Sequence, residues 1–370
     1  MPAGGTRTVQ GRRLPLPARA ALVALAAACA IHVAAIAPAQ AAAPPGFLGM
    51  SAPRAKSGEF ARMADGGVGT YRLVASWHGV QGSRDGPFHW GHIDREVSAA
   101  ATNGIQPIIT LFGSAPFVSS DPRVPPVGTA VAQRGWKRFV AAAVARYGPE
   151  GELWSERPEL PYMPVRTWEV WQEQNATFFW HGRGGPSPRR YAKLVRLTDS
   201  AASELDPGAQ LLVGGMFDDP SGRKSIAAKK YLQGVYKTGV ASRFDGVGVH
   251  PYAKNVGGVM REIEQTRRVM DRRGDFAKLI WVTEIGWSTK GPRGWALVTS
   301  RGGQARKLES TFSKLIARRG RYGLRAVIWF SWRDYRDREC RWCGGSGVLT
   351  SSGKPKPAWS RFSSIAGPVG

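Results

Sequence analysis

The sequence predicts an α/β protein, a single-domain (β/α)8 TIM barrel that follows a signal peptide. Eight short apolar runs alternate along the 370-residue chain with longer stretches of helical periodicity. Most of these runs are apolar at nearly every position, as expected of parallel strands that helices cover on the outside. No internal repeat or low-complexity linker divides the chain. Eight strand–helix units in one undivided chain match a single barrel with enlarged loops.

The predicted strands are the runs 47–50, 69–74, 105–111, 167–171, 210–214, 246–250, 279–283 and 326–330. The predicted helices are the segments 92–103, 136–147, 189–205, 229–238, 259–273 and 304–319. The alternative fold is a doubly wound open sheet, which is expected to have a glycine-rich phosphate-binding turn after the first strand. The first strand instead continues as FLGMSAPRA, without that glycine pattern, so the barrel is favoured.

Residues 1–41 have the composition of a secretory signal peptide. Four arginines without an acidic residue precede an alanine-rich apolar run over 20–36, and Ala39-Gln40-Ala41 offers a cleavage site. The alternative is a membrane anchor, but a run of this length is near the lower limit for spanning a bilayer. We therefore expect export, with the mature domain at 42–370 outside the cell or at the cell envelope, and no transmembrane segment after cleavage.

Two cysteines remain after the expected cleavage, Cys340 and Cys343 in the sequence CRWC. In an exported protein such a pair is expected to form a local disulfide that fixes a loop. A zinc site would need further cysteine or histidine ligands nearby, and a redox motif would need a strand-to-helix context that this segment lacks. Neither a metal nor another cofactor is expected.

The chain is strongly basic, with 52 Lys and Arg against 27 Asp and Glu and a formal net charge of +25. An acidic polysaccharide as substrate, or association with an anionic cell envelope, would suit this charge. A purely compositional origin suits it equally, because the basic residues are scattered and arginine predominates. No basic run with interleaved aromatic residues appears, so a nucleic-acid partner is not expected.

Polar residues gather where the predicted strands end, and in a TIM barrel the chemistry lies at that face. The ends of the second, fourth, sixth and seventh strands supply Arg72, Gln172, Glu173, His250, Tyr252 and Glu284, within YR, WEVWQEQN, HPY and WVTEIGW. A pair of carboxylates facing each other across a cleft is what cleavage of a glycosidic bond requires. The site therefore indicates a carbohydrate substrate.

Four tryptophans are candidates for binding sugar rings, because an indole offers a flat apolar face and a polar N–H. Trp77 follows the second strand and Trp180 follows the fourth, and each belongs either to the cleft or to the core of its loop. Trp329 and Trp332 lie three residues apart at the last strand, so a regular strand cannot turn both inward. Trp332 is favoured because it is nearer the C-terminal end.

Together these motifs resemble clan A glycoside hydrolases, in particular families 39 and 5. In that clan the fourth strand ends in an Asn-Glu pair, often within WEIWNEPN, where this chain has WEVWQEQN. The resemblance implies that Glu173 is the acid/base and Glu284 the nucleophile of a retaining mechanism. It also implies substrate-binding roles for Arg72, His250 and Tyr252, and a closing helix at the C-terminal KPAWSRF.

Two departures from the clan pattern leave an alternative function open. Gln172 replaces the asparagine that normally holds the sugar 2-hydroxyl, and the third strand, PIITLFGSAPF, lacks a histidine that many relatives carry. The alternative is an envelope-associated carbohydrate-binding barrel with weak or lost catalysis, and a third hypothesis is a scaffold held at the envelope by its charge. Retention of both carboxylates favours the enzyme, because burying two acids together is costly.

Overall fold

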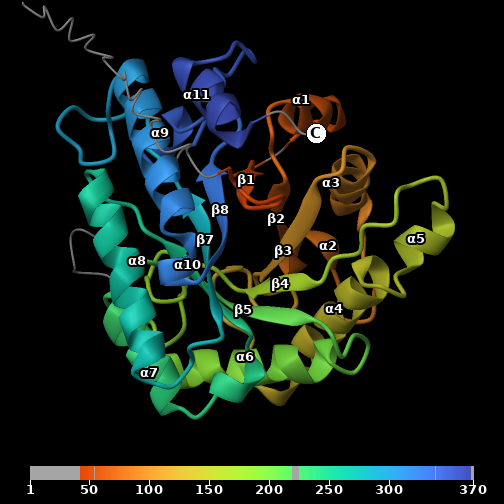
Figure 1. Ribbon diagram of the computed structural model, residues 1–370. Coiled ribbons are helices and arrows are strands. Elements are labelled where there is room, and N and C mark those ends of the chain that lie inside the picture. The colour runs from red at the N-terminus through yellow and green to blue at the C-terminus, as the bar shows by residue number, and fades with distance from the viewer. Residues whose placement is uncertain (1–41, 54, 219–224, 338, 368–370) are drawn as a thin grey trace, which may run out of the picture. The chain divides into compact units, whose positions relative to one another are not determined.

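The computed structural model describes residues 42–53, 55–218, 225–337 and 339–367 (Figure 1). The predicted signal peptide, residues 1–41, lies outside the described residues. Eight strands pair in sequence order, each parallel to its neighbours, and β8 pairs with β1 to close the barrel. The predicted TIM barrel is thus confirmed. None of the described helices is both long and apolar enough to cross a membrane.

All eight predicted strands are present, with their ends shifted by a few residues. They are β1 Leu48–Ser51, β2 Thr70–Ser76, β3 Gln106–Phe112, β4 Thr167–Val170, β5 Gln210–Phe217, β6 Gly246–His250, β7 Leu279–Ile285 and β8 Leu324–Phe330. The fourth strand ends one residue earlier than predicted. Trp171 has a φ of 67°, which an extended strand does not allow, so the chain turns there.

The six predicted helices are also present and surround the barrel (Figure 1). They are α3 Gly91–Thr102, α4 Ala130–Tyr147, α6 Pro188–Ala202, α7 Ala228–Lys237, α8 Val256–Asp271 and α9 Arg301–Ala317. Shorter helices add to them: α1 Phe60–Asp65, α2 Trp77–Val80, α5 Glu152–Glu156, α10 Arg319–Tyr322 and the closing helix α11 Pro357–Ala366. The KPAWSRF segment therefore forms a helix, as its resemblance implied.

Side-chain caps fix where several of the long helices begin after their loops. Thr129, Ser187, Asn255 and Ser300 each accept a hydrogen bond from a backbone N–H three residues on, at the start of α4, α6, α8 and α9. Such caps satisfy donors that the first helical turn leaves without partners. They define the ends of the loops that rim the C-terminal face of the barrel.

The interior of the barrel changes from apolar to polar along its axis. Ile108, Leu212, Trp281, Ala326 and Ile328 form an apolar cluster of their own, separate from the larger core between strands and helices. Inward positions alternate along each strand. The next inward positions toward the C-terminal ends of β2, β3, β4 and β6 are Arg72, Thr110, Glu169 and His250, all buried. The polar floor of the site therefore continues the barrel interior.

Candidate active site

Glu284 is held by two donors at the end of β7. Arg72 Nη1 donates to its Oε1 at 2.7 Å, and the Tyr252 hydroxyl donates to its Oε2 at 2.9 Å. The pairing of β7 with β8 shifts register between Val282 and Ile285, and such a bulge re-aims the side chains beside it. Glu284 is therefore turned to the cavity with both oxygens fixed, as a nucleophilic carboxylate requires.

Glu169 is a second buried partner of Arg72. Its Oε2 accepts from Arg72 Nε at 2.7 Å and from the Thr110 hydroxyl, and its Oε1 accepts from the backbone N–H of Gly215 at 2.8 Å. Burial raises the pKa of Glu169, but the charge of Arg72 and these hydrogen bonds outweigh it, so the pKa is lowered. The carboxylate of Glu169 orients the guanidinium that holds Glu284.

The sequence analysis missed Glu169, although it lies within WEVWQEQN. From that motif it takes only the residues at the strand end, Gln172 and Glu173. The period-two alternation Thr167, Glu169 could have revealed it, because alternate positions of a barrel strand face inward. Glu169 is fully buried. Burying an unpaired carboxylate is costly, so an acid at this position needs a buried partner such as Arg72.

Glu173 follows β4 in a tight turn and meets His250 of β6. Glu173 has a φ of 44°, and its backbone N–H donates to the carbonyl of Gly215 at 2.8 Å. Its Oε1 lies 2.8 Å from Nδ1 of His250. Burial raises the pKa of Glu173 and the charge of Glu284 adds to this, while His250 opposes it, and the pKa is raised overall. A carboxyl that keeps its proton is suited to act as an acid.

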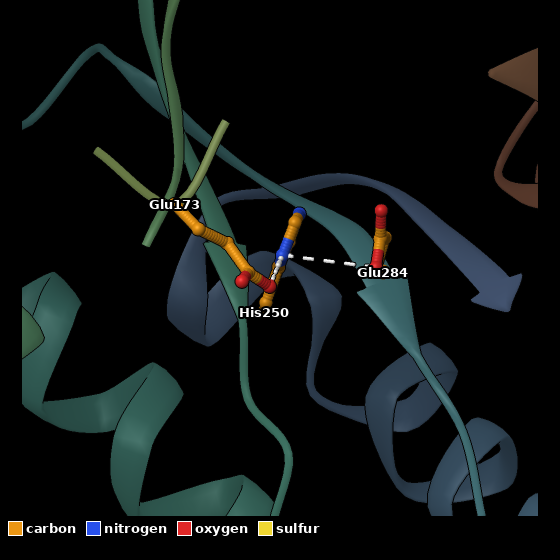
Figure 2. A group of neighbouring side chains, drawn as sticks. All are labelled: Glu173, His250 and Glu284. Atoms are coloured by element: carbon orange, nitrogen blue, oxygen red, sulfur yellow. Dashed lines mark hydrogen bonds and ion pairs between the residues drawn. The ribbon is translucent and has the colours of Figure 1, made fainter. Parts of the chain in front are cut away.

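The two carboxylates converge on His250 (Figure 2). Nδ1 of His250 lies 2.8 Å from Oε1 of Glu173 and 3.8 Å from Oε2 of Glu284, and one atom of each residue lies within 4.8 Å of the others. Burial lowers the pKa of His250, but the Glu284 charge and the Glu173 hydrogen bond outweigh it and raise the pKa. His250 thus joins the two acids.

Gln172 is also part of the site, and Arg72 orients it. Its Oε1 accepts from Nη2 of Arg72 at 3.2 Å, so the amide oxygen is anchored. Its Nε2 donates to no acceptor among the described residues. The amide therefore presents its NH2 group to the cavity, where a sugar hydroxyl could accept from it.

Two glycines of β5 allow these groups to approach. A Cβ on Gly214 would lie 2.4 Å from the carbonyl of Trp171, and a Cβ on Gly215 would lie 2.0 Å from Nε2 of His250. Both distances are far shorter than any contact that two such atoms can make. Glycine at these two positions lets β4 and His250 pack directly on the backbone of β5.

The structure does not bring the four predicted tryptophans into the cleft, because each is fully buried in the core. Trp77 packs on Phe139 and donates to Gln81, and Trp180 packs between Trp171 and Tyr191.

The tryptophans at the last strand are buried as well. Trp329 packs on Trp287 and donates to the carbonyl of Ser346, and Trp332 packs on Trp359 of α11. Ala326 and Ile328 of the same strand face inward, so Trp329 at the alternate position faces the helices. Phe330, half-buried at the next inward position, is the aromatic residue that β8 presents to the cleft.

Beside Tyr252 lies an open pocket of 690 Å³ that the sequence analysis did not anticipate. Asp218, Lys254 and Leu297 line it from the loops after β5, β6 and β7, and Lys230 of α7 and Glu262 of α8 complete the lining. Burial, with a contribution from the charge of Asp218, raises the pKa of Glu262 to about 8. The pocket offers room for a bulky polar group next to the carboxylate pair.

The ligand atoms of Glu173, His250 and Glu284 are also close enough together to bind a metal ion. The donors already present weigh against such binding. The guanidinium of Arg72 lies 2.7 Å from Glu284, and a divalent cation there would be repelled by it. Both oxygens of Glu284 already accept hydrogen bonds. The arrangement suits a carboxylate pair better than a metal site.

The structure is similar to solved glycoside hydrolases. A family 39 glycoside hydrolase from Bacteroides cellulosilyticus WH2 superposes with a TM-score of 0.66 at 20% identity, covering 87% of this chain and 63% of that one. A variant endo-β-1,4-glucanase from Xanthomonas axonopodis pv. citri gives 0.56 at 15% identity, covering 86% and 98%. Xylanase 10B from Thermotoga petrophila RKU-1, in complex with xylobiose, gives 0.57 at 13% identity, covering 87% and 94%.

These likenesses concern the fold. The barrel is of the kind found in clan A glycoside hydrolases, including families 39 and 5, as the motifs had implied. This chain spans less than two thirds of the length of the family 39 protein. Its sequence matches no protein-family model and no curated protein. The activity must therefore be argued from the site itself.

Proposed function

We propose that the protein is an exported glycoside hydrolase that retains anomeric configuration, with Glu284 as nucleophile and Glu173 as acid/base. The observation that carries this is the pair of carboxyl groups of Glu173, in the turn after β4, and Glu284 of β7, which have one oxygen each within 4.8 Å of the other. Retaining enzymes hold their two carboxyl groups about 5–5.5 Å apart, whereas inverting enzymes need about 6.5–9.5 Å to admit a water molecule. The short separation favours direct attack by a carboxylate.

The different surroundings of the two acids assign their roles. Glu284 accepts from Arg72 and Tyr252, donors that stabilise a carboxylate anion. The pKa of Glu173 is raised, chiefly by burial, so this residue holds a proton for the leaving group. Two neighbouring carboxyl groups in different surroundings, one held by a guanidinium and a hydroxyl and the other buried with a raised pKa, are the arrangement of an acid–nucleophile pair.

The proposed reaction has two displacements. In the first, an oxygen of Glu284 bonds to the anomeric carbon, the glycosidic bond breaks, and Glu173 gives its proton to the departing oxygen. In the second, Glu173 takes a proton from water, whose oxygen bonds to the anomeric carbon as the ester to Glu284 breaks. Gln172 would donate to a sugar hydroxyl, and Arg72 keeps Glu284 in position throughout.

The substrate proposal is a glycan or glycoside, with β-linked polysaccharides as the first to test. The structurally similar proteins include an endo-β-1,4-glucanase, an exo-β-1,4-mannosidase and a xylanase in complex with xylobiose. The net charge of +25 adds acidic polysaccharides to the candidates, and it also suits association with an anionic envelope. Export is proposed from the composition of residues 1–41.

The test is release of reducing sugar from glucans, mannans, xylan and polygalacturonate, together with chromogenic glycosides. The mature chain is compared with Glu284→Gln and Glu173→Gln, and with a control, Glu309→Gln, at a surface ion pair with Arg361. Turnover that both site variants abolish, and that a chelator leaves unchanged, supports the proposal. Chelator-sensitive turnover would favour a metal at the same residues.

Absence of turnover across the panel would favour the alternative, an inactive carbohydrate-binding barrel. That alternative predicts glycan binding that survives Glu284→Gln, and Gln172→Asn is then the substitution to examine for restored activity. A charge-held scaffold predicts binding to anionic polymers alone, without turnover and with loss at high salt.

A further inference from the structure

Trp342 lies next to the proposed nucleophile, separated from it by one side chain. Its ring centroid is 5.0 Å from that of Tyr252, in an edge-to-face arrangement. Tyr252 in turn donates to Glu284 at 2.9 Å and is itself 4% exposed. Trp342 therefore covers the tyrosine that orients Glu284, and it does so from the loop that follows β8.

Trp342 differs from the buried tryptophans because part of its side chain is accessible and its indole N–H is available to a ligand. It is half-buried, whereas Trp77, Trp171 and Trp329 are fully buried and donate to protein oxygens. No described residue accepts a hydrogen bond from the indole nitrogen of Trp342. An exposed indole face with a free donor is what a sugar ring and its hydroxyls can engage.

The Cys340–Cys343 disulfide brackets Trp342 and closes a very short loop, with the two Cα atoms 5.4 Å apart. Asp337 fixes the start of this loop by accepting from the backbone N–H of Cys340 at 2.8 Å. Ser346 fixes its end, because its hydroxyl donates to the carbonyl of Cys343 at 2.6 Å. The backbone that carries Trp342 is thus constrained on both sides.

The loop after β7 supports the same segment. A Cβ on Gly291 would lie 3.4 Å from Cα of Trp342, so the two loops are in close contact. The guanidinium of Arg341 stacks 5.4 Å from the ring of Trp295, which is 42% exposed. The CRWC loop is therefore held against its neighbour and keeps Trp342 at the mouth of the cleft.

We propose that Trp342 is a substrate-binding residue that contacts a sugar ring beside the cleaved bond, and that the Cys340–Cys343 disulfide holds it in place. This inference rests on the proposed glycosidase function. In this proposal the CRWC segment, which lies outside the catalytic pair, contributes to substrate affinity. The indole would stack on the apolar face of the ring and donate its N–H to a hydroxyl.

The test measures binding separately from turnover. Dissociation constants for carboxymethylcellulose, xylan, glucomannan and polygalacturonate are measured by affinity electrophoresis in the Glu284→Gln background, and kcat and KM are measured with Glu284 intact. The changes are Trp342→Ala, Trp342→Phe and the double change Cys340→Ser with Cys343→Ser. The control is Phe276→Ala, an aromatic residue 72% exposed just before β7 at the opposite end of the barrel.

Trp342→Ala is expected to weaken binding about tenfold, equivalent to about 1.4 kcal/mol, with Trp342→Phe in between. The double serine variant should weaken binding in the same direction. A dithiol should weaken binding by the parent and leave the serine variant unchanged. Phe276→Ala should match the parent.

Four outcomes would overturn the inference in whole or in part. If Trp342→Ala lowers kcat while the dissociation constants stay the same, Trp342 only supports Tyr252. If the serine variant binds as the parent does, the disulfide has no part. If the parent neither binds nor cleaves any glycan of the panel, both this inference and the proposed function fail. If Glu284→Gln abolishes turnover while Trp342→Ala keeps both turnover and binding, only this inference fails.

Discussion

At the residue scale, Arg72 organises the site because its guanidinium reaches three side chains. It forms hydrogen bonds with Glu169 of β4, Gln172 in the turn after β4 and Glu284 of β7. A planar guanidinium with five fixed donors can hold such a set, which a lysine ammonium cannot do in the same geometry. The position of Glu284 therefore depends on Glu169, which is fully buried.

Glu169→Gln is expected to lower the free energy of unfolding by about 3 kcal/mol near neutral pH, because it leaves Arg72 buried with one carboxylate fewer. The pKa of Glu169 is lowered in the folded state, so its contribution is present above about pH 4.3 and lost as pH falls through the folded pKa. Urea unfolding at several pH values measures this. Glu264→Gln, at an exposed helical ion pair with Arg268, is the matched control and should change little.

His250→Asn is expected to move the alkaline limb of the pH–activity profile to higher pH. Activity requires a protonated Glu173 and falls as pH rises through its pKa. His250 lowers that pKa against the larger effect of burial, so its removal raises it further. Profiles of kcat/KM for both proteins measure the shift. An unchanged or lowered alkaline limb would show that Glu173 is not the acid.

The polar residues of the candidate site could be predicted from sequence because strand ends carry them. Arg72, Glu173, His250, Tyr252 and Glu284 lie in or just after the last residues of predicted strands, and parallel strands bring their ends to one face. The aromatic residues could not be predicted in the same way. Whether a loop tryptophan faces the cleft depends on packing between distant segments, and Trp342 owes its place to a contact with Tyr252.

At the element scale, β5 sets how closely the catalytic groups approach. Its Gly214-Gly215 pair lets the turn after β4 and the ring of His250 rest on its backbone. The register between β5 and β6 shifts between Val213 and Met216, at these glycines. Such close approach is a recognised reason for glycine within a strand.

Gly215→Ala is therefore expected to displace His250 and to lower kcat by at least about tenfold, since small misplacements of catalytic groups are costly. Gly320→Ala, at a helical glycine with no atom within 4 Å of the added Cβ, is the control and should leave kcat unchanged. Steady-state kinetics with the best substrate of the panel measure both. Equal kcat for Gly215→Ala and the parent would refute this role of β5.

At the scale of the whole molecule, the fold could be predicted from the alternation of apolar runs and helical stretches. The functional role of the high positive charge could not be predicted from the sequence. All eight strands could be placed because a buried parallel strand is apolar throughout. The net charge of +25 comes from basic residues that are scattered along the sequence. Its effect on substrates is therefore a question for measurement.

If the charge serves substrate binding, KM for polygalacturonate should rise steeply as salt is increased, while KM for a neutral glucan should stay nearly constant. Salt at about 0.1 M already screens charges beyond about 10 Å, so long-range attraction is lost first. Initial rates across a salt series measure this. The same salt response for neutral and acidic glycans would assign the charge to composition alone.

The central claim is that Glu284 forms a covalent bond to the sugar while Glu173 serves as acid/base. The most direct measurement is the mass of Glu173→Ala after incubation with an aryl glycoside, followed by peptide mapping. An aryl leaving group needs no protonation, so the first displacement proceeds and the second is slowed. The account predicts a mass increase of one glycosyl unit located on Glu284. For a glycoside that the parent hydrolyses, the absence of an adduct on the variant, or an adduct at another residue, would contradict the claim. A product of inverted configuration from the parent would contradict it as well.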